Sequence, residues 1–325
     1  MKYIYLDQNK WIELARGLKL GDTEYIELKN RIDSKIHAHE WAFPVSLIHL
    51  AETMKRNDDT SRKNVLDLMF ELSNGYGVCD YSSADRIEFD SWLEYSSVNH
   101  SKLTESIICD DYANIIGVLN QSILDSVIES VRNESNVANQ KIENAHIFIE
   151  ALKKSRFIFD YIASHAIELS NDESFYYNQY QKAKEKFDKW VDYCKSLDEY
   201  KKKHLFPAYT IKMFFAEYEK KISVLSKENQ EKIKTMFMNP DKDPDFLESL
   251  PGFNIYNRLV YELFTSSNRE ISSHDFYDIA FLRVAIPYCD IVVCEKHWGH
   301  TVSKLKLDTK YHTVVTKNIM HLLEM

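Results

Sequence analysis

Two acidic residues of this sequence directly follow short apolar runs of β-strand type. Asp7 follows the run YIYL at positions 3–6, and Glu295 follows the run IVVC at positions 291–294. Runs of this kind are typical of strands that are buried in a parallel sheet. Because sites in open parallel α/β sheets form at the carboxyl ends of the strands, we expect both carboxylates to lie at that edge of one sheet.

Two further acids lie on helices that adjoin such runs. Glu52 falls in the second turn of a helix that follows the apolar run 41–45 and has Ser46 as its expected N-cap. Asp278 falls in the first turns of a helix expected at about 275–285. Four carboxylates at one sheet edge would repel one another, and Mg²⁺ or Mn²⁺ relieves that repulsion because these ions take oxygen ligands. Such an ion also activates water and neutralises charge on a phosphodiester.

The elements that would position these acids form two α/β segments on either side of a long helical segment. Further strands are expected in the outer segments at 76–79 and 311–315, whereas residues 81–264 show repeated helical periodicity and dense charge. The sequence therefore predicts a helix-rich α/β protein. In it a discontinuous parallel-sheet domain, 1–80 and 265–325, is split by a large all-helical insertion.

Glycine and asparagine mark two helix ends in the first segment. Gly17 is expected to stop a short helix that begins near Lys10, and Asn74 with Gly75 is expected to close a helix over 59–73.

Composition and charge narrow the classes of function. The 325 residues suffice for one large or two medium domains, and seven glycines and six prolines are too few for a turn-rich barrel or sandwich. The formal charge of −9 argues against a protein that binds nucleic acid through bulk basic surface, but not against a nuclease with an acidic metal site. Five cysteines without a C-x-x-C pair indicate reduced thiols. We find no signal peptide or membrane-spanning run, so a cytoplasmic protein is expected.

The ordered set of acids resembles the PIN domain, a family of metal-dependent nucleases. The resemblance rests on LDQN at 6–9, on SLIHLAE at 46–52, and on DIA at 278–280 leading to IVVCE at 291–295. The two outer α/β segments carry it, and the helical segment between them has no counterpart in the family.

The resemblance implies a role for each matched position. The four acids would be the catalytic residues and would hold one or two Mg²⁺ or Mn²⁺ ions; they are Asp7, Glu52, Asp278 and Glu295. Asn9 matches the polar residue that often stands two positions after the first acid and would support it. The family more often has Asp at the fourth position, and Asp290, at the other end of the same strand, is a competing acid.

The function implied by the resemblance is endonucleolytic hydrolysis of phosphodiester bonds, in RNA rather than DNA. Many bacterial members of the family are toxins of toxin–antitoxin pairs or phage-defence effectors. A regulatory protein or antitoxin as partner, and assembly into a homo-oligomer, are expectations of the same kind.

Exposed aromatic residues such as Trp11, Tyr176 and Tyr177 are candidates for stacking on unpaired bases.

Each acid also has a purely structural interpretation. Asp7 is a suitable N-cap for the helix that follows it. Glu52 has basic residues three and four positions later, Lys55 and Arg56, with which it could pair on a helix face.

Glu295 could likewise pair with Lys296 or Lys317. Ser272 and Asp275 fit a capping box, which assigns Asp275 to the helix start and leaves the acid one turn later as the ligand. A different class of function is also open, namely a helical interaction or scaffold protein with an inactive PIN-like remnant. The long insertion and the net acidity favour that class.

Overall fold

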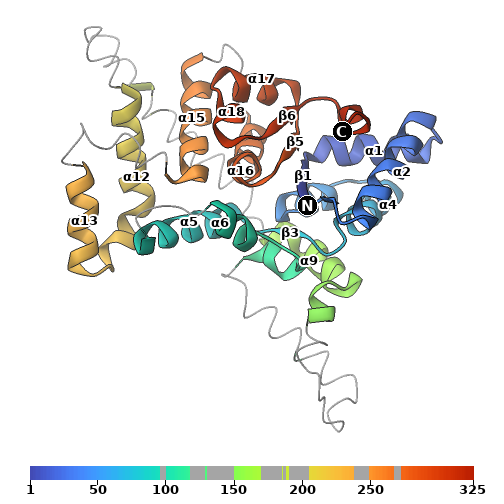
Figure 1. Cartoon of the computed structure of the whole chain (residues 1–325), viewed down its shortest axis with the longest axis horizontal. Helices are drawn as coiled ribbons and strands as arrows, with labels where there is room; N and C mark the ends of the chain where they lie inside the picture. Colours follow the sequence, from blue (N-terminus) through green and yellow to red (C-terminus); the bar gives the residue numbers. More distant parts are fainter. Residues whose placement is uncertain are drawn as a thin grey trace. The chain divides into compact units, whose positions relative to one another are not determined.

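The computed structural model describes residues 1–95, 100–117, 150–169, 205–237, 249–266 and 272–325 (Figure 1). Between these ranges it also describes residues 129, 185, 188 and 189. The chain divides into two compact units. Unit 1 comprises Met1–Ala84, His100–Asn171 and Val284–Met325, and unit 2 comprises Asp85–Asn99 and Asp172–Arg283.

A parallel sheet lies at the centre of unit 1 and contains four of the described strands. They are β1 (Lys2–Leu6), β2 (Trp41–Ala42), β5 (Ile291–Val293) and β6 (Val314–Thr316), in the order β2-β1-β5-β6. β1 pairs with β2 on one side and with β5 on the other, where Leu6 lies opposite Val293. Because every pair is parallel, the residues after β1, β5 and β6 all emerge at one edge.

The central strands are buried on both faces. Ile4, Tyr5 and Leu6 are almost completely buried, and so is every residue of β5. Such continuous burial is typical of parallel sheets that have helices on both faces. The coarse expectation of a helix-rich α/β fold with a parallel sheet is therefore confirmed.

Helices of unit 1 begin where polar side chains cap them. Asp22, Ser46 and Asp58 accept hydrogen bonds from the first turns of three of these helices. The described α-helices that lie wholly in unit 1 are α1 (Gln8–Lys19), α2 (Thr23–His37), α3 (Leu47–Met54), α4 (Asp59–Ser73), α6 (His100–Ile107), α9 (Arg156–Leu169), α17 (Lys296–Lys304) and α18 (Leu307–Tyr311), with 3₁₀ turns η1 (Tyr112–Ile116) and η4 (Ile319–Leu323).

Two of these helix ends test the sequence-based expectations. α4 closes at Asn74, whose left-handed conformation ends the helix as predicted. The expected stop at Gly17 is wrong, because α1 continues to Lys19. The ring of Tyr25 lies where a side chain at Gly17 would be, so this glycine serves packing rather than termination.

The expected all-helical insertion 81–264 requires correction. Strand β4 (Ile108–Cys109) lies inside it and pairs antiparallel with β3 (Gly77–Val78). Helix α9 also belongs to unit 1, where Phe159 and Ile162 enter the same hydrophobic core as Leu50 of α3. These contacts join part of the expected insertion to the sheet domain, so the expected boundaries 1–80 and 265–325 differ from those of unit 1.

The described part of unit 2 is helical. It contains α12 (Leu205–Ser223), α13 (Lys227–Phe237) and α15 (Pro251–Ser266), most of α5 (Tyr81–Tyr95), and the first part of α16 (Ser273–Tyr288). Aromatic side chains, including Phe89, Phe214 and Phe253, form its core. Among the described residues of the whole chain, no helix combines the length and apolar character needed to cross a bilayer.

Candidate active site

Asp7 stands at the carboxyl end of β1 and at the start of α1. Its Oδ1 accepts hydrogen bonds from the backbone N–H groups of Asn9 at 2.7 Å and Lys10 at 3.3 Å. The side chain therefore is the N-cap of α1, as the structural interpretation predicted. Only Oδ1 is used in this cap, and Oδ2 makes no hydrogen bond with any described residue.

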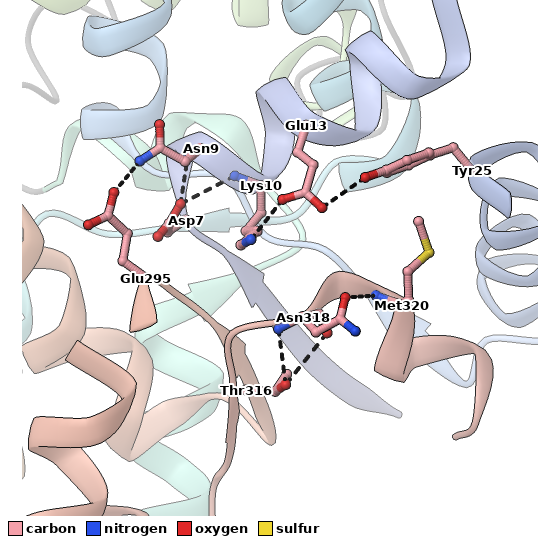
Figure 2. Close-up of polar contacts among 9 residues, drawn as sticks. All are labelled: Asp7, Asn9, Lys10, Glu13, Tyr25, Glu295, Thr316, Asn318 and Met320. Carbon is pink, nitrogen blue, oxygen red and sulfur yellow. Dashed lines mark hydrogen bonds and ion pairs between the residues drawn. The ribbon is translucent and has the colours of Figure 1, made fainter. Parts of the chain in front are cut away.

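Glu295 stands at the carboxyl end of the neighbouring strand and faces Asn9 (Figure 2). The Asn9 side chain donates from Nδ2 to Oε1 of Glu295 at 2.5 Å. Glu295 precedes α17 but makes no capping bond to it. The alternative of an ion pair with Lys296 or Lys317 is wrong, because Glu295 binds Asn9 instead.

Asn9 thus joins the two strand-end acids. Its backbone N–H holds Asp7, and its side-chain amide holds Glu295. The PIN resemblance implied only that Asn9 would support the first acid, and the bond to Glu295 was not part of that expectation. The geometry depends on the parallel pairing of β1 with β5, which brings the two strand ends side by side.

The electrostatics of this pair are unfavourable in the absence of a cation. The pKa of Asp7 is raised from 3.8 to about 6. Burial is the main cause and the negative charge of Glu295 adds to it, while the hydrogen bonds from Asn9 and Lys10 act in the opposite direction. Asp7 is only 3% exposed. A nearby positive charge would stabilise the ionised form of a carboxylate in such a place.

Glu52 lies on α3, which packs beside the start of α1. Gln8 Nε2 donates to Thr53 Oγ1 at 2.8 Å, which ties the two helices together. Glu52 is partly buried, and its charge, like that of Asp7, raises the pKa of the buried Tyr5 hydroxyl after the larger effect of burial. Both acids therefore lie within electrostatic reach of the same buried hydroxyl.

Asp278 differs from the other three acids because it belongs to unit 2. It is partly buried on α16. One turn earlier, Asp275 Oδ2 accepts hydrogen bonds from the Ser272 backbone N–H at 2.8 Å and from its hydroxyl at 3.2 Å. The capping assignment of Asp275 is therefore confirmed.

The four predicted acids do not form a single ligand cluster. Throughout the described ranges, no group of three or more His, Cys, Asp or Glu side chains is arranged to hold a metal ion. The structure links Asp7 to Glu295 through Asn9 and places Glu52 on the adjoining helix.

Asp290, the competing acid, lies at the opposite end of β5. Its Oδ2 accepts a hydrogen bond from the backbone N–H of Tyr3 at 2.7 Å, so it fixes the beginning of β1. This position removes Asp290 from the edge that carries Asp7 and Glu295.

Polar residues after β6 also lie at the carboxyl edge, although no sequence pattern predicted them there. Thr316 Oγ1 and His321 Nδ1 are 2.7 Å apart, and Asn318 caps the following turn through Met320 N–H at 3.1 Å (Figure 2). Lys317 between them is exposed and makes no ion pair with a described residue. The strand-end rule points to these residues once β6 is known to end at Thr316 rather than at 315.

Of the aromatic candidates for base stacking, Trp11 is wrong. Trp11 is completely buried, with its ring against Phe43 and His49. Tyr176 and Tyr177 lie outside the described residues.

Comparison with known proteins gives no relative: no protein-family description, no curated protein and no solved structure matches this chain.

Proposed function

We propose that this chain is a divalent-metal-dependent endonuclease with a PIN-like sheet domain, and that its substrate is RNA. The observation that carries the proposal is the group Asp7–Asn9–Glu295, assembled at the carboxyl edge of a parallel sheet from the two ends of the chain. The preference for RNA, and a role as a toxin or phage-defence effector, come from the PIN resemblance.

The donor set suits Mg²⁺ or Mn²⁺. These ions are commonly held by one or two carboxylates, with the other positions filled by water and substrate phosphate. Asp7 and Glu295 supply two carboxylates, and Glu52 is the candidate for a third ligand from α3. The raised pKa of Asp7 supports this assignment, because a cation would offset the buried negative charge. When bound, the ion lowers the pKa of water and neutralises charge on the phosphodiester.

The chain's own residues would orient the acids and the substrate. The first N–H groups of α1 hold Oδ1 of Asp7 and leave Oδ2 for a ligand. Asn9 fixes the rotamer of Glu295. Lys317 and Lys296 are exposed beside this edge and make no ion pairs with described residues, so their ammonium groups are available to a phosphate.

The direct test is cleavage of RNA by the purified full-length chain. We expect Mn²⁺-dependent cutting of a labelled RNA, loss of cutting with a chelator, and recovery when Mn²⁺ is restored. Asp7→Asn should abolish cutting while the protein remains folded by circular dichroism. Equal activity of wild type and Asp7→Asn across a metal titration would refute the proposal.

A second candidate function is supported by a different observation. No group of three acidic or metal-binding side chains is arranged as a metal site within the described residues, and Asp278 lies in unit 2. This favours an interaction protein whose PIN-like domain is inactive. Expression that harms a bacterial host, with the harm removed by Asp7→Asn, supports the nuclease. Harmless expression together with a stably co-purifying protein supports the interaction protein.

A further inference from the structure

A hollow of about 380 Å³ opens along α1 and the start of α2, next to the candidate site. Asn9, which holds Glu295, lies at one end of it, and Leu20 lies at the other. The volume falls within the range of pockets that bind small ligands. The groove therefore continues from the acidic site along the surface of unit 1.

One wall of the groove is built around a glycine. A Cβ atom on Gly17 would lie 2.2 Å from Cγ of Tyr25, so only glycine lets the tyrosine ring lie directly on the backbone of α1. The Tyr25 hydroxyl donates to Glu13 Oε1 at 2.9 Å, and Lys10 Nζ donates to Glu13 Oε2 at 2.7 Å (Figure 2). The ring is thus fixed, and the negative charge of Glu13 is balanced by a lysine.

The rim of the groove carries an arginine that pairs with no described acid. Arg16 is exposed, and its guanidinium makes no ion pair or hydrogen bond within the described part of the chain. The other acid of the groove, Asp22, is occupied as the N-cap of α2 through Glu24 N–H at 3.0 Å. Leu20, 73% exposed, adds an apolar surface. A free arginine beside apolar and aromatic surface suits a ligand that combines a phosphate with a flat ring.

We propose that this groove binds the nucleotide of single-stranded RNA next to the phosphate that is cleaved. The base lies against Ile12, Leu20 and Tyr25, and Arg16 contacts the adjoining phosphate. An unpaired base is required, because bases within a duplex are stacked on one another and cannot enter. The inference rests on the proposed nuclease function and adds to it the strand type and the contacts of the substrate.

The test measures binding separately from cleavage. In the full-length Asp7→Asn background, a fluorescein-labelled single-stranded oligoribonucleotide is titrated by anisotropy in Mn²⁺, beside its duplex form. Arg16→Gln should weaken single-strand binding roughly 10-fold. It should also reduce the steepness of log affinity against log salt concentration by nearly the amount that one phosphate contact contributes. Leu20→Ser should weaken single-strand binding without changing that slope. Arg62→Gln, which removes a partly buried arginine of α4 that pairs with Asp59 and does not line the groove, is the control for the loss of one positive charge.

In the otherwise wild-type chain, Arg16→Gln should raise KM more than it lowers kcat. If wild type cleaves RNA and Arg16→Gln has the same KM, the proposed role of the groove is wrong but the proposed nuclease function stands. Equal effects of Arg16→Gln and Arg62→Gln also overturn it, because bulk charge would then explain the binding. Absence of cleavage by wild type refutes the nuclease, whereas RNA binding that still depends on Arg16 and Leu20 would support the groove alone.

Discussion

Asn9 donates a hydrogen bond to Glu295 at 2.5 Å, although 286 positions of sequence separate the two residues. The contact exists because Leu6 and Val293 lie opposite each other in paired parallel strands. Any change that shifts this register also separates the two acids, so stability of the sheet and geometry of the site are coupled.

Asp7→Asn should stabilise the protein at neutral pH while removing cleavage. Burial raises the pKa of Asp7 from 3.8 to about 6, so the folded state prefers the protonated acid and the ionised acid destabilises it. Asparagine retains the N-cap and removes the charge. We expect the free energy of unfolding at pH 7 to rise by about 1–3 kcal/mol, measured by urea denaturation.

The pH dependence checks this explanation. The destabilising effect of the Asp7 charge develops as pH rises from 3.8 to about 6, so wild type and Asp7→Asn should differ least near pH 4. A loss of stability at pH 7 would show that the bonds from Asn9 and Lys10 to the carboxylate outweigh its burial.

Glu295→Gln and Asp290→Asn form a matched pair at the two ends of β5. Glu295→Gln should lower kcat roughly 100-fold, because it removes a carboxylate from the proposed metal site. Asp290→Asn should leave kcat unchanged and cost about 1 kcal/mol of stability through its bond to Tyr3. Initial rates at saturating Mn²⁺ measure kcat for both variants. Equal losses of kcat in the two would show that Glu295 is not part of the site.

His49 should make the protein less stable as pH falls. Burial lowers its pKa from 6.5 to about 3, so between these values the unfolded chain takes up a proton that the folded chain does not. The free energy of unfolding should then fall by up to about 1.4 kcal/mol for each pH unit. His49→Phe retains a ring against Tyr5, which the imidazole contacts at 4.7 Å between centroids.

The measurement is the slope of unfolding free energy between pH 6.5 and pH 4.5, the range that follows from the pKa of His49. The slope for His49→Phe should be shallower than that for wild type, by up to the amount that the uptake of one proton on unfolding contributes. His300→Gln, a change at an exposed histidine of α17, is the control. Parallel slopes for wild type and His49→Phe would contradict the buried, neutral imidazole.

Asp85 and Arg283 form a buried ion pair inside unit 2, with Arg283 Nη2 at 2.5 Å from both carboxylate oxygens. Asp85→Ala should cost about 3–5 kcal/mol because it leaves a buried charge without its partner. The double change Asp85→Leu with Arg283→Leu should recover most of that loss. Lys234→Ala breaks the exposed pair with Glu231 and should cost under about 1 kcal/mol. Denaturation curves that rank these variants otherwise would contradict the account.

Local signals in the sequence predicted the elements that local chemistry determines. The apolar runs before Asp7 and Glu295 are strands, and the helix over 59–73 has the predicted limits. The strand expected at 41–45 is shorter, because Pro44 lacks the N–H that a sheet ladder needs, and β2 ends at Ala42.

Long-range packing produced the features that the sequence did not reveal. Nothing in the sequence near Gly17 indicates that Tyr25 will cover it, so the groove beside Arg16 could not be anticipated. The attachment of α9 to α3 depends on the shape of a shared core rather than on a motif. The bond from Asn9 to Glu295 was not predicted, because it depends on the pairing of β1 with β5.

The place of β1 in the sheet has a consequence for synthesis of the protein. β1 leaves the ribosome long before its neighbour β5, because β5 lies far later in the sequence. A product interrupted anywhere before Ile291 contains Asp7 without Glu295 and has no assembled site. If the chain cuts RNA as proposed, the messenger that encodes it is spared by its own nascent product until β5 and Glu295 have been translated.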